Sequence, residues 1–178
     1  ILGAATADIE WGGRRIAFSG DLGRYADPFM LDPEPIAEAD FVVIESTYGN
    51  RIHEQTDPAE ALGEVVERTV ARGGTVVIPA FAVGRAQALL YYLWKLREAG
   101  RLRNVPIYLD SPMAIKATDM LCDHLADHRL APEVCRASCE IAIYTREVEQ
   151  SKEISTNSYP KIVISASGMA TGGRVLHH

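Results

Sequence analysis

The chain has 178 residues, of which 47% are hydrophobic and 24% are charged, a composition typical of a folded globular protein and not of a disordered one. No apolar run approaches the ~20 residues that span a bilayer, and no segment has the pattern of a signal peptide. We therefore expect a cytoplasmic protein with no membrane partner. The formal net charge of −6 argues against binding of nucleic acid by bulk attraction alone, so any polyanion must meet a local basic site.

The chain contains three cysteines, Cys122, Cys135 and Cys139. Their number is odd and no pair has C-x-x-C spacing, which argues against a zinc ribbon. We interpret them as free thiols.

Residues 4–18 have the pattern of a β-hairpin, with Gly12 and Gly13 at the turn. The segment Ser-Gly-Asp-Leu-Gly at 19–23 then ends the second strand, and a loop rich in Pro and Asp follows. Residues 41–44 form a short, wholly apolar run. Such a run is typical of a strand that is buried on both faces.

From residue 57 onward, amphipathic helices alternate with short apolar strands. This alternation predicts an α/β fold, a doubly wound and mostly parallel sheet with flanking helices. Residues 130–158 are less regular, with one short strand candidate at 141–144, and the segment from Gly172 is expected to start a last helix. The predicted helices cover 57–72, 83–99 and 112–126, and the predicted strands 75–78, 106–109 and 161–164.

Four predicted strands lead directly into small, polar or glycine-rich segments. Ligands bind at the carboxyl ends of the strands in an open parallel sheet, where such segments can present N–H groups to an anion. Taken singly these signals are weak, since Asp110 or Glu45 can equally cap a helix or pair with an arginine. The segments are 45–49, 79–85, 110–112 and 165–169.

The segment from Ser167 to Arg174 is more specific. Its glycines permit close backbone approach, and Arg174 is expected in the first turn of a helix, where its charge opposes the helix dipole. An anion bound nearby explains that charge. A tight turn with a solvated arginine is the alternative.

Asp21 lies just past the second strand of the hairpin. It can be an ordinary turn residue, or its carboxylate can bridge two metal ions. Spacing alone does not decide between these interpretations.

Five motifs together resemble the β-CASP family of metallo-β-lactamase-fold nucleases, in the order of that family and with plausible spacings. Within it they are more similar to the RNA-processing branch (cleavage-and-polyadenylation endonuclease and its bacterial and archaeal relatives) than to the DNA-repair branch. The motifs are Phe-Ser-Gly-Asp-Leu-Gly-Arg (18–24), Glu-Ser-Thr-Tyr-Gly-Asn-Arg-x-His (45–53), Pro-Ala-Phe-Ala-Val-Gly-Arg-x-Gln (79–87), Asp-Ser-Pro-Met-Ala (110–114) and Ser-Ala-Ser-Gly-Met-x-x-Gly-Gly-Arg (165–174).

The resemblance implies a zinc-dependent RNA phosphodiester hydrolase with RNA as its partner. It implies that residues 1–44 are the C-terminal strip of an N-terminal metallo-β-lactamase part and that residues 45–178 are most of a β-CASP domain. We therefore expect an internal fragment, which begins with Ile1 rather than Met and whose other partner is the remainder of the metallo-β-lactamase domain. An apolar surface left exposed in the fragment can also drive formation of a homodimer.

The resemblance assigns roles residue by residue. Asp21 matches the aspartate that bridges two zinc ions, and Glu45 matches a catalytic acidic residue that orients a histidine beside the metals. His53 receives no chemistry. Residues that match segments lining the RNA groove are Arg85, Ser111, Ser167, Gly168, Met169, Gly172, Gly173 and Arg174. His177 and His178 fit the pattern after Gly-Gly-Arg, or else they begin an affinity tag.

Most of the family's metal ligands are missing from this sequence. The His-x-His-x-Asp-His motif is absent, another ligand histidine normally precedes Ile1, and two later motifs are expected beyond His178. Stable zinc sites need about three or four protein ligands, and only Asp21 remains. We therefore expect two zinc ions in the full-length parent, none held tightly by this chain, and no nuclease activity of the chain alone.

Two other functions compete with this interpretation. One is a non-catalytic α/β module that binds phosphate or RNA. The other is a nucleotide-binding domain of Rossmann type, which is disfavoured because no Gly-x-Gly-x-x-Gly follows the first strand.

Overall fold

The computed structural model describes residues 1–52 and 55–178. It divides into two compact units, Ile1–Gln55 with Ala126–Arg129, and Thr56–Leu125 with Leu130–His178. The domain boundary predicted after residue 44 lies inside the first unit and stays a prediction. No helix formed by the described residues is long and apolar enough to cross a membrane.

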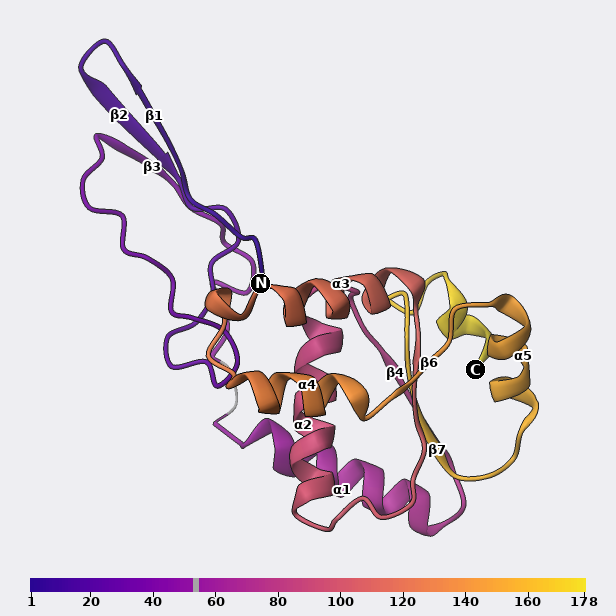
Figure 1. The fold of residues 1–178 in the computed structure, drawn as a ribbon. Coiled ribbons are helices and arrows are strands. Elements are labelled where there is room, and N and C mark those ends of the chain that lie inside the picture. Colours follow the sequence, from indigo (N-terminus) through magenta and orange to yellow (C-terminus); the bar gives the residue numbers. More distant parts are fainter. Residues whose placement is uncertain (53–54) are drawn as a thin grey trace. The chain divides into compact units, whose positions relative to one another are not determined.

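The first unit contains a three-stranded sheet in the order β1-β2-β3 (Figure 1). Strands β1 (Ala7–Trp11) and β2 (Arg14–Phe18) form the predicted antiparallel hairpin. Its turn residues Gly12 and Gly13 have φ of +59° and +73°, a conformation that glycine adopts without steric strain. Strand β3 (Phe41–Val43) pairs with β2 in parallel.

The predicted burial of residues 41–44 is wrong for this structure. Their side chains are 49–63% exposed, and β3 is an edge strand of the described sheet. An apolar sequence shows that a strand can be buried, but it does not show which surface covers it.

The second unit contains a four-stranded sheet in the order β4-β7-β5-β6. All neighbouring strands are parallel, which confirms the predicted sheet. Its strands are β4 (Thr75–Pro79), β5 (Ile107–Asp110), β6 (Ile143–Tyr144) and β7 (Lys161–Ser165).

Helices lie on both faces of this sheet, which confirms the α/β class. Helices α1 to α4 lie on one face and α5 on the other (Figure 1). The core is formed by apolar side chains of the helices and of the central strands, among them Leu90, Leu93, Ile115, Leu109 and Ile164. The helices are α1 (Pro58–Ala71), α2 (Arg85–Glu98), α3 (Pro112–Asp123), α4 (Pro132–Glu140) and α5 (Val148–Thr156), with short 3-10 helices η1 (Leu125–Asp127) and η2 (Arg174–His177).

Helix α1 shows how local signals set an element boundary. The Asp57 carboxylate accepts a hydrogen bond from the Ala59 N–H at 2.8 Å, and Pro58 occupies the first turn, where a missing N–H is harmless. Gly73 follows the helix with φ of +79°. By contrast, α4 and α5 lie in residues 130–158, whose sequence has no regular helical pattern, and the helix expected from Gly172 is only the four-residue η2.

Candidate functional site

The loops after the strands of the second unit gather at one edge of its sheet. Pairing places both Pro79 of β4 and Asp110 of β5 opposite Ser165 of β7. Because all four strands are parallel, the motif segments that follow β4, β5 and β7 share this carboxyl edge. The predicted convergence of these three segments is therefore confirmed, whereas residues 45–49 belong to the other unit.

Asp110 is the last residue of β5 at this carboxyl edge, and its side chain is 0% exposed. The carboxylate accepts hydrogen bonds from Arg174 Nη1 at 2.6 Å and from Ser151 Oγ at 2.6 Å, and it lies 2.8 Å from His178 Nε2. A buried carboxylate is tolerated when donors and an opposite charge surround it. Asp110 therefore joins β5 to the C-terminal segment and to α5.

Arg174 is held inside the protein rather than solvated. Besides its ion pair with Asp110, it donates to the carbonyl oxygens of Thr145 at 3.3 Å and Arg146 at 3.1 Å. Three of its donor contacts are thus internal, and its side chain is 22% exposed. Of the interpretations open for Asp110, pairing with an arginine is the one that the structure shows.

His178 completes the same network. Its ring lies with Nε2 at Asp110 and with Nδ1 3.0 Å from Ser155 Oγ on α5, and its side chain is 2% exposed. Sequence analysis assigned no role to His178, Ser151 or Ser155. No signal in the spacing relates them to Asp110, because the fold alone brings Ser151 and His178 to Asp110 and Ser155 to His178.

Two glycines permit close backbone approach, one between the loops after β4 and β7 and one within the loop after β7. A Cβ at Gly168 would lie 2.9 Å from the backbone N of Phe81, and one at Gly173 would lie 2.8 Å from the Ala166 carbonyl oxygen. Both contacts are too close for any side chain, so glycine is required. In the same loop the Met169 N–H donates to Ser167 Oγ at 3.3 Å.

Arg85 and Ser111, two other predicted RNA-binding residues, have different surroundings. Arg85 is exposed at the start of α2, and the neighbouring Gln87 side chain braces its loop by accepting from the Gly84 N–H at 2.7 Å and donating to the Ala82 carbonyl at 3.0 Å. Ser111 is 3% exposed and caps α3 by accepting from the Ala114 N–H at 3.2 Å. Arg85 thus offers a solvent-facing cation, whereas the Ser111 hydroxyl already has a structural partner.

The first unit holds the two other predicted site residues on adjacent loops. Asp21 is exposed, and no described residue forms a hydrogen bond or ion pair with its carboxylate. Glu45 Oε1 accepts a hydrogen bond from the backbone N–H of Leu22 at 2.5 Å, and its own N–H donates to Ser19 Oγ at 3.1 Å. The Asp21 carboxylate is therefore not engaged in the turn, and Glu45 braces the loop that presents it. His53, in the same motif as Glu45, lies outside the described residues.

Asp21 fits a metal-bridging role only as part of a larger ligand set. A carboxylate can offer one oxygen to each of two ions, and this one has no competing described partner. A zinc site needs about three or four protein ligands, so Asp21 alone does not form one.

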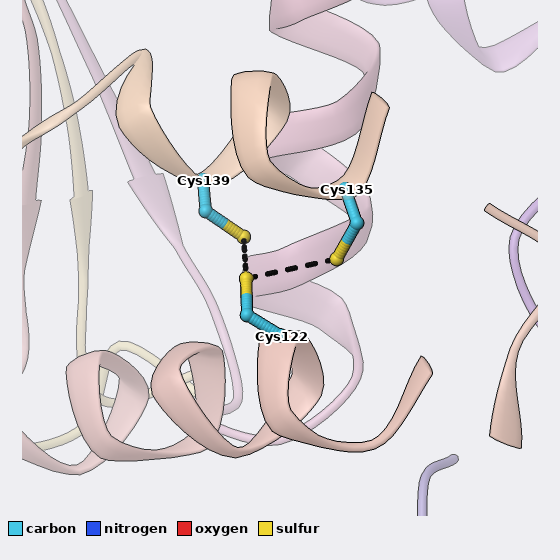
Figure 2. Close-up of side chains that lie close together, drawn as sticks. All are labelled: Cys122, Cys135 and Cys139. Atoms are coloured by element: carbon cyan, nitrogen blue, oxygen red, sulfur yellow. Dashed lines mark hydrogen bonds between the residues drawn. The ribbon is translucent and has the colours of Figure 1, made fainter. Parts of the chain in front are cut away.

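The three cysteines, expected as free thiols, come together between α3 and α4 (Figure 2). All three lie in the described part of the chain and form no disulfide bond. Burial, reinforced by the Cys122 thiol, raises the pKa of Cys135 to about 11 and also raises the pKa of Cys139. Without a metal these two thiols are neutral at pH 7 and weakly nucleophilic.

Comparison with known proteins decides the family. The model of the Beta-Casp domain matches residues 86–178. The chain belongs to the β-CASP family. Over 99% of its length it is 36% identical to Ribonuclease TTHA0252 of Thermus thermophilus, and over its whole length it is 34% identical to an RNase J-like protein of Methanocaldococcus jannaschii. It is also 41% identical, over 65% of its length, to cleavage and polyadenylation specificity factor subunit 3-I of Arabidopsis thaliana.

The β-CASP chain spans 42% and 43% of the first two of these relatives and 17% of the third. The family match and these relatives confirm the resemblance to RNA-processing nucleases.

Proposed function

We propose that the full-length parent of this chain is a zinc-dependent ribonuclease that hydrolyses RNA phosphodiester bonds. Relatives named as ribonucleases support the reaction class. The observation that carries the proposal is the state of Asp21, whose exposed carboxylate has no described partner while Glu45 holds the next residue of its loop. An aspartate that served only the turn is expected to bond a nearby N–H group itself.

The predicted residues of the two loops then have physical tasks. Asp21 offers the bridging carboxylate, and Glu45 sets the position of its loop. Arg85 and the N–H groups of Gly168, Gly172 and Gly173 bind RNA phosphates, with Arg174 holding their loop through Asp110. When bound, a zinc pair activates water near neutral pH and offsets negative charge on the phosphoryl group.

The chain alone is proposed to be inactive, since a single carboxylate does not hold a zinc pair. It then acts as a module that binds phosphate or RNA. Its exposed apolar strand β3 is the surface proposed to meet the remainder of the metallo-β-lactamase domain, or a second copy in a homodimer of the isolated chain. The proposed location is the cytoplasm.

The test is RNA cleavage by the full-length protein before and after removal of metal. We expect chelation to abolish cleavage and added Zn²⁺ to restore it. The reading frame should also contain His-x-His-x-Asp-His within about 150 residues upstream of Ile1, about one domain length. Cleavage that survives complete metal removal, or the absence of that motif, contradicts the proposal.

A further inference from the structure

Three cysteines from two helices direct their sulfur atoms toward one another (Figure 2). Cys122 lies in the last turn of α3. Cys135 and Cys139 are four residues apart on α4 and so lie on one face of that helix. The Sγ atom of Cys122 is 3.1 Å from that of Cys139 and 3.6 Å from that of Cys135, and all three Sγ atoms lie within 4.8 Å of one another.

These distances match a thiolate metal site. A Zn–S bond of about 2.3 Å in tetrahedral geometry separates the sulfur atoms by about 3.8 Å. The two distances from the Cys122 sulfur, 3.1 and 3.6 Å, are shorter than that value, and the third lies within 4.8 Å. Small side-chain shifts therefore bring all three sulfurs to one ion. A disulfide, with an S–S bond of about 2.05 Å, would use only two of the three.

We propose that Cys122, Cys135 and Cys139 together bind one Zn²⁺ ion. Cysteine thiolates are soft ligands that favour binding of zinc. The proposal reverses the interpretation of the cysteines as free thiols and the expectation that this chain holds no zinc tightly. Sequence spacing could not suggest it, because α4 was not foreseen.

The surroundings complete such a site. Cys135 and Cys139 are 0% and 8% exposed, which shields the ion from water. Cys122 and Cys139 also line a surface hollow through which an ion can enter. Asp119, Arg136 and Glu140 line the same hollow. The fourth ligand is water or the carboxylate of Asp119, which precedes Cys122 by one helical turn, and the Arg136 guanidinium offsets the negative charge of three thiolates.

The ion fastens the end of α3 to α4. Its three sulfur ligands come from α3 and α4, whereas the proposed hydrolytic site uses the Asp21 carboxylate of the other unit. The inference therefore stands or falls independently of the ribonuclease activity.

The experiment is a titration of metal-free, reduced full-length protein with Cd²⁺, followed by the ultraviolet thiolate-to-Cd²⁺ charge-transfer absorption. The wild-type spectrum should contain an absorption component that reaches its maximum at one equivalent of Cd²⁺. That component should disappear when Zn²⁺ competes for the site. Cys122→Ala and Cys139→Ala should each lose that component. Ser138→Ala is the control, because Ser138 is a buried residue of α4 between the two helical cysteines and should keep it.

Cys122→Ala alters a partly exposed residue and keeps the test decisive if a variant at the buried Cys139 fails to fold. Equal absorption in wild type and a folded Cys122→Ala protein overturns the proposal. A Cys122–Cys139 disulfide in protein purified without oxidant, detected as a mass lower by two hydrogens, also overturns the proposal.

Discussion

The Glu45 carboxylate accepts a hydrogen bond from the backbone N–H of Leu22 at 2.5 Å. This contact joins the loop after β3 to the loop after β2, across 23 residues of sequence. Because Leu22 directly follows Asp21, the position of the Asp21 carboxylate depends on Glu45. The resemblance assigns Glu45 a separate task, which needs its negative charge, so the two tasks can be separated by substitution.

Glu45→Gln keeps an acceptor oxygen for Leu22 but loses the charge, whereas Glu45→Ala loses both. We expect the full-length Glu45→Gln enzyme to retain its zinc but to have a lower turnover rate. Ala should lower both zinc content and turnover. A hydrogen bond to a charged group contributes about 1.5–3 kcal/mol. Its loss in Glu45→Ala therefore corresponds to roughly a 10- to 100-fold change in turnover. Glu34→Gln, at an exposed position in the same unit, is the control, and wild-type kinetics in Glu45→Ala would refute both tasks.

The buried pair of Arg174 and Asp110 should behave as one unit in a double-mutant cycle. Arg174→Ala leaves a fully buried carboxylate without its cation, and breaking a buried pair in this way costs about 3–5 kcal/mol. Adding Asp110→Asn should recover part of that loss in the urea unfolding midpoint. The comparison is Arg15→Ala, which breaks a surface pair with Asp8 and should cost about 0–1 kcal/mol. Strict additivity of the two single effects would contradict the pairing.

Arg85 is expected to contact RNA directly. Arg85→Ala should weaken RNA binding about equally across sequences and lower the salt dependence of affinity by about one phosphate contact. Arg72→Ala is matched in charge and exposure, but Arg72 ends α1 just before β4, at the opposite edge of the sheet. An unchanged salt slope in Arg85→Ala would remove Arg85 from the interface.

Asp27 predicts a pH dependence of stability. Burial alone raises the pKa of Asp27, but hydrogen bonds from the Met30 and Phe29 N–H groups and from Arg24 outweigh it and hold the pKa below 3.8, its ordinary value. Its stabilisation is therefore complete well above pH 3.8 and is lost as the pH falls through the lowered pKa. Wild type should be more stable than Asp27→Asn at pH 7, with a difference that shrinks in acid. A difference that is constant with pH would contradict this role.

The sheet and its helices were predictable wherever local chemistry agreed with the apolar pattern, as at Asp57 and Pro58 before α1. Helices α4 and α5 were missed because each is nine residues long with few apolar side chains in helical spacing. The strand at 41–43 has a buried strand's composition, but sequence does not show what covers it.

The sequence was sufficient to predict which loops converge at the candidate site. It was not sufficient to predict which side chains pair there. Arg174 and Asp110 are 64 residues apart, and only the strand order β4-β7-β5-β6 brings them together. The cysteines likewise carry no recognisable spacing, because their geometry depends on the packing of α3 against α4.

The central claim is that Asp21 is a metal ligand, and two matched substitutions in the full-length enzyme test it. Asp21→Asn keeps the shape of the side chain but loses its charge. Asp27→Asn makes the same change at an aspartate whose carboxylate is already bonded to Arg24 and to the Phe29 and Met30 N–H groups.

The deciding measurement is bound zinc together with the RNA cleavage rate for wild type and both variants. Asp21→Asn should lose zinc from the hydrolytic pair and slow cleavage by about two or more orders of magnitude, equivalent to about 2.7 kcal/mol or more in the barrier, with the fold intact. Asp27→Asn should lose stability but keep zinc and turnover. Wild-type zinc content and cleavage rate in folded Asp21→Asn enzyme would contradict the account.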